Sequence, residues 1–288
     1  MSTSNGTSVS RRGFISTAGA LIAAYGMTES TVSAMSLFKR KIPLGLQLYS
    51  LREMSRKDFP GAIEASARMG FDGVEFAGYF DTSAKDLRKI LDNNGLKCCG
   101  THTAIETLSN ENFQSTVDYN KIIGNKYLIV PSLPMNKLNT RKACLETAAQ
   151  FNELDEKARE QKMRVGYHNH TFEFEKVDGE FLFDIFYGNT NESVVMQLDT
   201  GHALHGGGNP SAIVQKYPGR VETVHIKEYS ATDPNALVGE GDMDWETVFA
   251  ACETVGGTKW YIVEQERYPV PPLESVERCM ANLRKMGK

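Results

Sequence analysis

The sequence from residue 42 onward predicts an α/β fold, a single (β/α)8 TIM barrel. Short runs rich in Val, Ile, Leu and Phe alternate with longer stretches of helical period, and eight such pairs follow one another without a break in composition. The short runs are apolar almost throughout, as expected for parallel strands that helices cover. An open doubly wound sheet is the alternative. It is disfavoured because no G-x-G-x-x-G fingerprint follows the first run, where Gln47-Leu48-Tyr49-Ser50-Leu51-Arg52 stands instead.

The N-terminal segment has the order of an export signal. Ser10-Arg11-Arg12-Gly13-Phe14-Ile15-Ser16 precedes a short apolar stretch, and the small residues Val32-Ser33-Ala34 follow it. Paired arginines before Gly-Phe-Ile resemble the twin-arginine signal, whose machinery exports folded proteins. The alternative is a chance Arg-Arg pair. We expect a signal over 1–34, a linker over 35–41 and a catalytic barrel over 42–288. The expected location is exported or periplasmic. No stable membrane span is expected, because the apolar stretch is short.

The eight apolar runs are the predicted strands. They lie at about 42–48, 71–76, 96–102, 127–131, 163–169, 194–199, 221–227 and 259–264.

Amphipathic helices are predicted between these strands. The stretch 58–69 places Phe59, Ile63 and Ala67 on one face, and Gly70 follows where a helix would end. The stretch 83–94 groups Leu87, Ile90 and Leu91, with Gly95 beyond it. Residues 139–161 form the longest predicted helix, and 273–286 form the last.

Composition excludes some classes of protein. The 288 residues include 32 basic and 36 acidic side chains, a net charge of −4, which argues against a nucleic-acid partner. Hydrophobic residues make up 41% and charged residues 24%, as in ordinary globular proteins. Five cysteines are too few for a disulfide scaffold, and the adjacent Cys98 and Cys99 suit a structural bridge poorly.

Unusual polar residues gather at the predicted strand ends, where barrels of this class place their chemistry. All six histidines lie there or in the following loop, and none lies in a predicted helix. Carboxylates and imidazoles converging from several strands suit one divalent ion, Mn²⁺, Co²⁺, Zn²⁺ or Mg²⁺. Each residue also has an ordinary structural explanation: Asp199 before Thr200-Gly201 could be a helix N-cap, and a single histidine is often only a bonded polar group.

Several motifs resemble the xylose isomerase-like TIM-barrel superfamily, often described as sugar phosphate isomerases/epimerases. They are LGLQLYSLR (44–52), GFDGVEFAGYF (70–80), YHNHTFEFE (167–175), QLDTGH (197–202), HIKEY (225–229), VGEGDMDWETVF (238–249) and VEQERY (263–268). The resemblance covers essentially the whole chain after the signal. It implies one divalent ion held by strands 5 to 8, with Asp199, His225 and Glu264 as ligands. On strand 5 the epimerases have a glutamate, whereas this chain has His168, with Glu173 the nearest acid downstream; we take His168 as the ligand.

This departure bears on mechanism. Two opposed carboxylates can remove a proton from one face of a carbon and return one to the other, which is epimerisation. With imidazole on strand 5, one carboxylate is missing. A Lewis-acid metal that stabilises an enediolate remains, beside the bases His102, His170 and Glu264 and the cation Lys227. This set also suits loss of a β-substituent. The residues assigned to binding substrate are Gln47, Glu75, Glu173, His202, Trp245 and Arg267.

The predicted function is a metal-dependent carbohydrate enzyme of the isomerase/epimerase type that abstracts a proton next to a sugar carbonyl. A lyase or hydratase acting on keto-sugars or 3-keto-glycosides is the first alternative, and a sugar-binding protein without catalysis is the second. A nuclease of the endonuclease IV type is disfavoured by the acidic charge. The predicted partners are a small carbohydrate and, transiently, the twin-arginine machinery; a homo-oligomer is left open.

Overall fold

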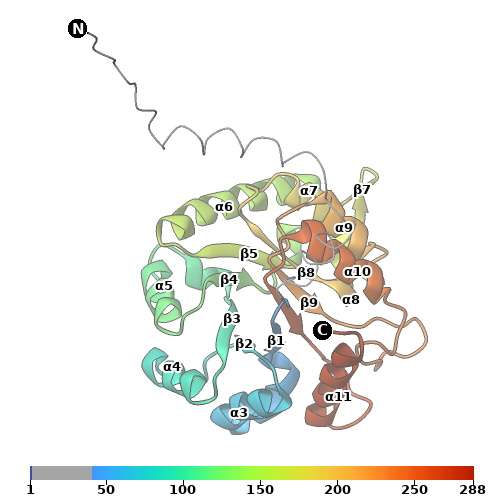
Figure 1. Cartoon of the computed structure of the whole chain (residues 1–288). Coiled ribbons are helices and arrows are strands. Elements are labelled where there is room, and N and C mark those ends of the chain that lie inside the picture. The colour runs from blue at the N-terminus through green and yellow to red at the C-terminus, as the bar shows by residue number, and fades with distance from the viewer. Residues whose placement is uncertain (2–40) are drawn as a thin grey trace. The chain divides into compact units, whose positions relative to one another are not determined.

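The computed structural model of this chain describes Met1 and residues 41–288. The predicted signal (1–34) and linker (35–41) therefore lie outside the described residues, apart from Met1 and Lys41. From Ile42 on, eight parallel strands close into a barrel in the order β1-β10-β9-β8-β5-β4-β3-β2, with helices around it (Figure 1). The predicted fold class is confirmed.

Each of the eight predicted strands is present, with ends that differ by at most two residues. They are β1 (Leu44–Gln47), β2 (Gly73–Phe76), β3 (Lys97–His102), β4 (Tyr127–Val130), β5 (Arg164–His168), β8 (Val195–Asp199), β9 (Thr223–Ile226) and β10 (Trp260–Val263). A small antiparallel hairpin of β6 (Lys176–Val177) and β7 (Glu180–Phe181) was not predicted and stands apart from the barrel.

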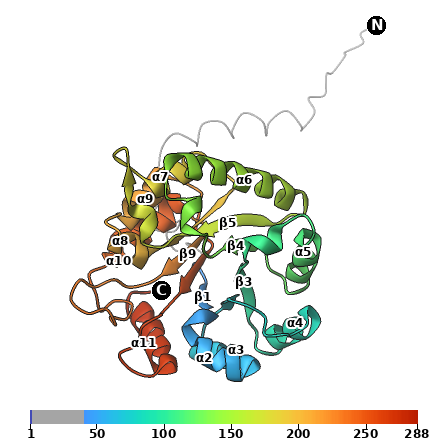
Figure 2. The same cartoon turned by 180° about the vertical axis from the view of Figure 1, so that it is seen from behind.

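Helices surround the barrel, as the view from behind in Figure 2 also shows. They are α2 (Arg52–Lys57), α3 (Phe59–Met69), α4 (Ala84–Asn93), α5 (Phe113–Ile122), α6 (Arg141–Glu160), α7 (Leu182–Tyr187), α8 (Thr200–His205), α9 (Pro210–Lys216), α10 (Trp245–Ala251) and α11 (Pro272–Lys285). Gly70 ends α3 with φ 91°, a backbone conformation that glycine adopts without strain. Among the described helices, none has the length and apolarity that a bilayer span requires.

One sequence prediction about helices is wrong. His202 and His205 lie within the short helix α8 and not in a loop. The helix starts at once after β8 because the Asp199 side chain accepts a hydrogen bond from the backbone N–H of His202.

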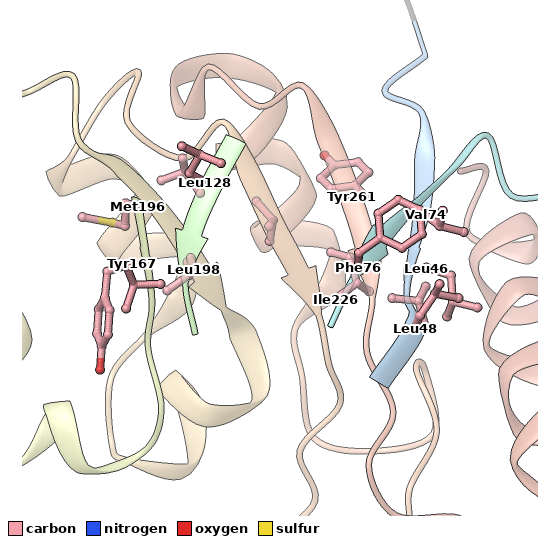
Figure 3. Packing of buried hydrophobic residues seen from close by; sticks show 14 of the residues in the cluster. Leu46, Leu48, Val74, Phe76, Leu128, Tyr167, Met196, Leu198, Ile226 and Tyr261 are labelled. Atoms are coloured by element: carbon pink, nitrogen blue, oxygen red, sulfur yellow. The ribbon is translucent and has the colours of Figure 1, made fainter. Parts of the chain in front are cut away.

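Side chains alternate between two faces of each barrel strand. Leu46, Val74, Met196 and Ile226 belong to the large apolar cluster between barrel and helices (Figure 3). A separate cluster of Tyr127, Ile129 and Val195, with Trp260 against it, is formed by the opposite faces of β4, β8 and β10. Gln47 and Glu75 directly follow Leu46 and Val74, so their side chains point the opposite way, into the barrel. Polar side chains from different strands can bond to one another there.

Candidate metal centre and active site

Four side chains meet where β5, β8, β9 and β10 end. His168, Asp199, His225 and Glu264 are all buried, and each offers a ligand atom within 4.8 Å of the others. They are the residues that the sequence assigns to the metal. His168, His225 and His102 form a second, overlapping group.

Asp199 gives an independent reason to expect a cation. Its Oδ1 atom accepts the His202 backbone N–H at 2.7 Å and so caps α8. Its Oδ2 atom is buried without a hydrogen-bond partner among the described residues. Lys227 Nζ lies 3.6 Å and His168 Nε2 3.9 Å from Oδ2. Because buried carboxylate oxygens are rarely left unpaired, this donor set fits a divalent ion.

Glu173, the other acid considered for strand 5, lies outside the cluster. Its Oε2 atom accepts the His170 backbone N–H at 2.8 Å, and its Oε1 atom accepts a hydrogen bond from the Tyr167 hydroxyl. Burial raises the pKa of the Glu173 carboxyl to about 7. Of the two strand 5 candidates, His168 is therefore the one in the cluster, and Glu173 supports the loop that follows.

Lys227 places a cation beside the cluster. Its Nζ atom lies 3.4 Å from Glu264 Oε2, 2.9 Å from Glu266 Oε2 and 3.1 Å from His202 Nε2. Burial opposes the charge, but the Asp199, Glu264 and Glu266 carboxylates prevail and raise the pKa of Lys227. The ammonium group can therefore stabilise negative charge that develops on a substrate oxygen.

Two histidines beside the cluster can act as bases. The ring of His102, at the end of β3, lies 5.1 Å from that of His168. The half-buried His170 has its ring 5.0 Å from that of His202. Burial, followed by the neighbouring His202, lowers the pKa of His170 to about 4, so this imidazole is neutral near pH 7 and can accept a proton.

A cavity of about 290 Å³ opens beside Lys227. Its walls include His202, Tyr229, Asp233, Glu266 and Arg267, and the Tyr229 ring stacks on His205 with centroids 5.1 Å apart. Polar groups of both signs next to an aromatic ring suit a polyhydroxylated molecule of sugar size.

The structure brings only part of the predicted substrate-binding set to this cavity. His202 and Arg267 line it. Gln47 and Glu75 have no exposed surface and bond to each other at 2.8 Å inside the barrel. Trp245 is buried in α10, where its Nε1–H donates to Glu228 Oε2 at 2.8 Å and its ring stacks on Phe249. Gln47, Glu75, Glu173 and Trp245 therefore do not lie on the cavity wall.

Sequence reasoning missed Gln197, Tyr229, Asp233 and Glu266. Gln197 lies two residues before Asp199 on β8, so the strand period of two already places both side chains on one face. Glu266 follows the strand 8 ligand by two residues. Tyr229 and Asp233 lie in the long connection after β9, where no local pattern indicates which residues turn toward the cavity.

Comparison with known proteins agrees with this architecture. An inosose dehydratase from Clostridium beijerinckii is 24% identical over 267 residues, covering 79% of this chain and 89% of that protein. A crystal structure of a sugar phosphate isomerase/epimerase from Parabacteroides distasonis matches with a TM-score of 0.74 and 25% identity, covering 85% and 94% of the two chains. A probable 3-DHS dehydratase from Bacillus anthracis matches in fold with a TM-score of 0.63 and 12% identity, covering 84% and 98%.

Residues 63–286 match the protein family described as xylose isomerase-like TIM barrel, which is most of the chain and includes seven of the eight barrel strands. The resemblance that the sequence motifs indicated is thereby confirmed: this chain belongs to the xylose isomerase-like TIM-barrel family.

Proposed function

We propose that this protein is a divalent-metal-dependent lyase that removes a β-substituent from a keto-sugar or keto-cyclitol. The proposal combines the family, the His168, Asp199, His225 and Glu264 cluster, and the neutral imidazole and buried ammonium beside it.

One observation favours elimination over epimerisation. Among the four clustered side chains, the carboxylates come from β8 and the end of β10, whereas β5 and β9 contribute imidazoles. Epimerisation needs a base on each face of the reacting carbon. Elimination needs one base and one group that assists the departing oxygen, and His170 and Lys227 supply this pair.

The chain's own residues would divide the work as follows. A divalent ion held by the cluster would supply positive charge to polarise the substrate carbonyl. His170, or His102 across the site, takes the proton from the carbon next to that carbonyl. The C–H electron pair forms the new C=C bond while the β C–O bond breaks. The departing oxygen takes a proton from Lys227 and leaves as water or an alcohol.

The relatives support this choice to different degrees. The Clostridium relative is named for the dehydration of inosose, and the Bacillus structure is named as a dehydratase. The Parabacteroides structure is named as an isomerase/epimerase. Epimerisation is therefore the second candidate. One feature of the site favours epimerisation: His102 on β3 and Glu264 after β10 come from strands that are not neighbours in the barrel. These two side chains could therefore serve as the two bases that epimerisation needs.

The two reactions differ in the fate of the substrate in deuterated water. We would incubate the protein with keto-inositols, keto-sugars and 3-keto-glycosides and follow the products by NMR. Elimination releases water or an aglycone and forms an unsaturated ketone. Epimerisation places deuterium on carbon without cleavage. Tight sugar binding without either product would instead support the binding-protein alternative.

Metal dependence is tested separately. Protein treated with a chelator should lose turnover and recover it with about one equivalent of a divalent ion. The double variant Asp199→Ala, Glu264→Ala should bind no ion and have no turnover. Full activity of metal-free protein would refute the proposal.

A further inference from the structure

Glu75 is a buried carboxylate that the proposed reaction does not use. It lies on β2 with no exposed surface and faces polar side chains from four other strands. Its partners are Gln47 Nε2 at 2.8 Å, Gln197 Nε2 at 2.7 Å, His225 Nε2 at 2.6 Å and His102 Nε2 at 3.3 Å. A side chain at position 100 would occupy this space, because a Cβ there would lie 2.3 Å from Glu75 Oε1.

The direction of these hydrogen bonds follows from one backbone group. The Tyr49 N–H lies 3.0 Å from Gln47 Oε1, and a backbone N–H can only donate. Gln47 Oε1 is therefore the acceptor of this amide, so its Nε2 atom is the one that faces Glu75. Glu75 Oε2 accepts from it.

The same reasoning extends to Gln197 and His102. Gln197 Nε2 lies 2.7 Å from Glu75 Oε1 and 3.1 Å from Thr223 Oγ1, so it donates to the carboxylate. Its Oε1 atom then faces His102 Nε2 at 2.9 Å and can only accept. His102 must therefore have its proton on Nε2, which leaves the Nδ1 lone pair available in neutral imidazole.

His225 is fixed in the same way and more directly. Its Nε2 atom lies 2.6 Å from Glu75 Oε2, an acceptor, so this nitrogen donates. Its Nδ1 atom faces the four-residue cluster and lies 3.0 Å from Glu264 Oε2. Histidines that bind metals commonly donate their second N–H to such a carboxylate.

We propose that Glu75, directly and through Gln197, sets the tautomer of two histidines at once. It holds the proton of His225 and of His102 on Nε2. Nδ1 of His225 is then left for the ion, and Nδ1 of His102 is left as the base. Glu75 is thus a positioning residue. The His102 tautomer does not depend on the proposed function. Nδ1 of His225 lies 3.0 Å from Glu264 Oε2, so this nitrogen also carries a proton in metal-free protein and is left for the ion only when one binds, a role that rests on the proposed function.

The test reads the tautomers by long-range ¹H–¹⁵N NMR on the full chain labelled with ¹⁵N-histidine. Spectra are recorded with and without Zn²⁺ at about pH 8, above the ordinary histidine pKa. Wild-type protein should show the Nε2–H form of His102 in both states and Nδ1 coordination of His225 with Zn²⁺. Glu75→Gln should give mixed tautomers and, measured against a competing chelator, bind Zn²⁺ about 10–100-fold more weakly.

Glu222→Gln is the matched control. Glu222 is another buried carboxylate; it accepts a hydrogen bond from the Tyr127 hydroxyl at 2.9 Å and pairs with Arg164, and no hydrogen bond or ion pair joins it to these histidines. This variant should leave both tautomers and the Zn²⁺ affinity unchanged. If Glu75→Gln does not fold, Gln197→Met should change the tautomer of His102 alone.

Two results would overturn the inference: in wild-type protein, a neutral His102 with its proton on Nδ1 or a His225 that binds Zn²⁺ through Nε2; or, in the variants, unchanged tautomers in both Glu75→Gln and Gln197→Met. Failure of the proposed function has a different signature. Wild-type protein would then bind no Zn²⁺, while the His102 tautomer could still be read in the metal-free spectrum.

Discussion

At the residue scale, Asp199 resolves a question that its sequence position leaves open. The sequence allows a helix cap or a metal ligand, and the structure gives its two oxygens different surroundings. Oδ1 caps α8, whereas Oδ2 is buried and unpaired among the described residues. One carboxylate can therefore start a helix and still offer an oxygen to an ion.

Asp199→Asn should separate these two functions. Asparagine is as good an N-cap as aspartate, so its Oδ1 atom can keep the bond to His202 and the protein should stay folded. The amide nitrogen would replace the unpaired oxygen, so divalent-ion affinity should fall at least about 100-fold. Calorimetric titration and thermal unfolding measure both effects. Asp244→Asn, at the cap of α10, is the control and should leave ion binding intact. Unchanged affinity in Asp199→Asn would contradict the assignment of Asp199 as a ligand.

Glu173 should make stability depend on pH. Its pKa is about 7 in the folded protein, above the ordinary value of 4.5, because of burial. The folded state therefore holds the proton more tightly than the unfolded chain. The resulting stabilisation is complete below about pH 4.5, is lost as pH rises through about 7, and is at most about 3 kcal/mol.

Glu173→Gln should remove this dependence. Between pH 5 and 8 the wild-type free energy of unfolding should fall relative to that of the variant, as urea titrations at several pH values would show. The exposed Glu156 on α6 provides the control, since Glu156→Gln should follow the wild-type curve. Parallel curves for wild type and Glu173→Gln would contradict the raised pKa.

At the element scale, a single carboxylate organises the connection between β9 and α10. Glu228 Oε1 accepts the backbone N–H groups of Tyr229 and Met243, at 3.0 and 3.1 Å. Its Oε2 atom accepts the Gly239 N–H at 2.7 Å and the Trp245 indole N–H at 2.8 Å. The connection contributes Tyr229 and Asp233 to the cavity wall, so Glu228 holds part of that wall in place.

Glu228→Gln should loosen this connection. Glutamine has one acceptor oxygen, so two of the four N–H groups would face its NH₂ group without an acceptor. We expect a loss of about 1–3 kcal/mol in stability and faster proteolysis within 229–244. Urea unfolding and limited proteolysis test this. Glu246→Gln, in the first turn of α10, should change either readout little. Equal protease resistance of Glu228→Gln and wild type would show that other contacts hold the connection.

At the scale of the whole molecule, the barrel was predictable because each strand is apolar along its length and each connection has helical period. The four clustered side chains were predictable because they end strands within family motifs. The depth of Gln47 and Glu75 was not. Strand period fixes which face a side chain occupies, but its height in the barrel depends on the stagger between strands, which only the closed sheet determines. Both residues therefore looked accessible and are buried.

We propose that the chain is exported through the twin-arginine pathway, on the strength of Arg11-Arg12 and the apolar stretch after it. The double variant Arg11→Lys, Arg12→Lys should stay unprocessed in the cytoplasm, whereas Arg40→Lys should be exported as wild type. Fractionation and immunoblotting of the tagged full chain distinguish the two. Periplasmic recovery of the double variant would contradict this route.

The short distance between position 100 and Glu75 also limits how this protein can evolve. A methyl group at Gly100 would strike the Glu75 carboxylate, which itself bonds to residues of three other strands. Neither position can change alone without disturbing the other. Relatives with a larger residue at the position of Gly100 should therefore also have a shorter side chain in place of Glu75, and the two positions should be inherited as a pair.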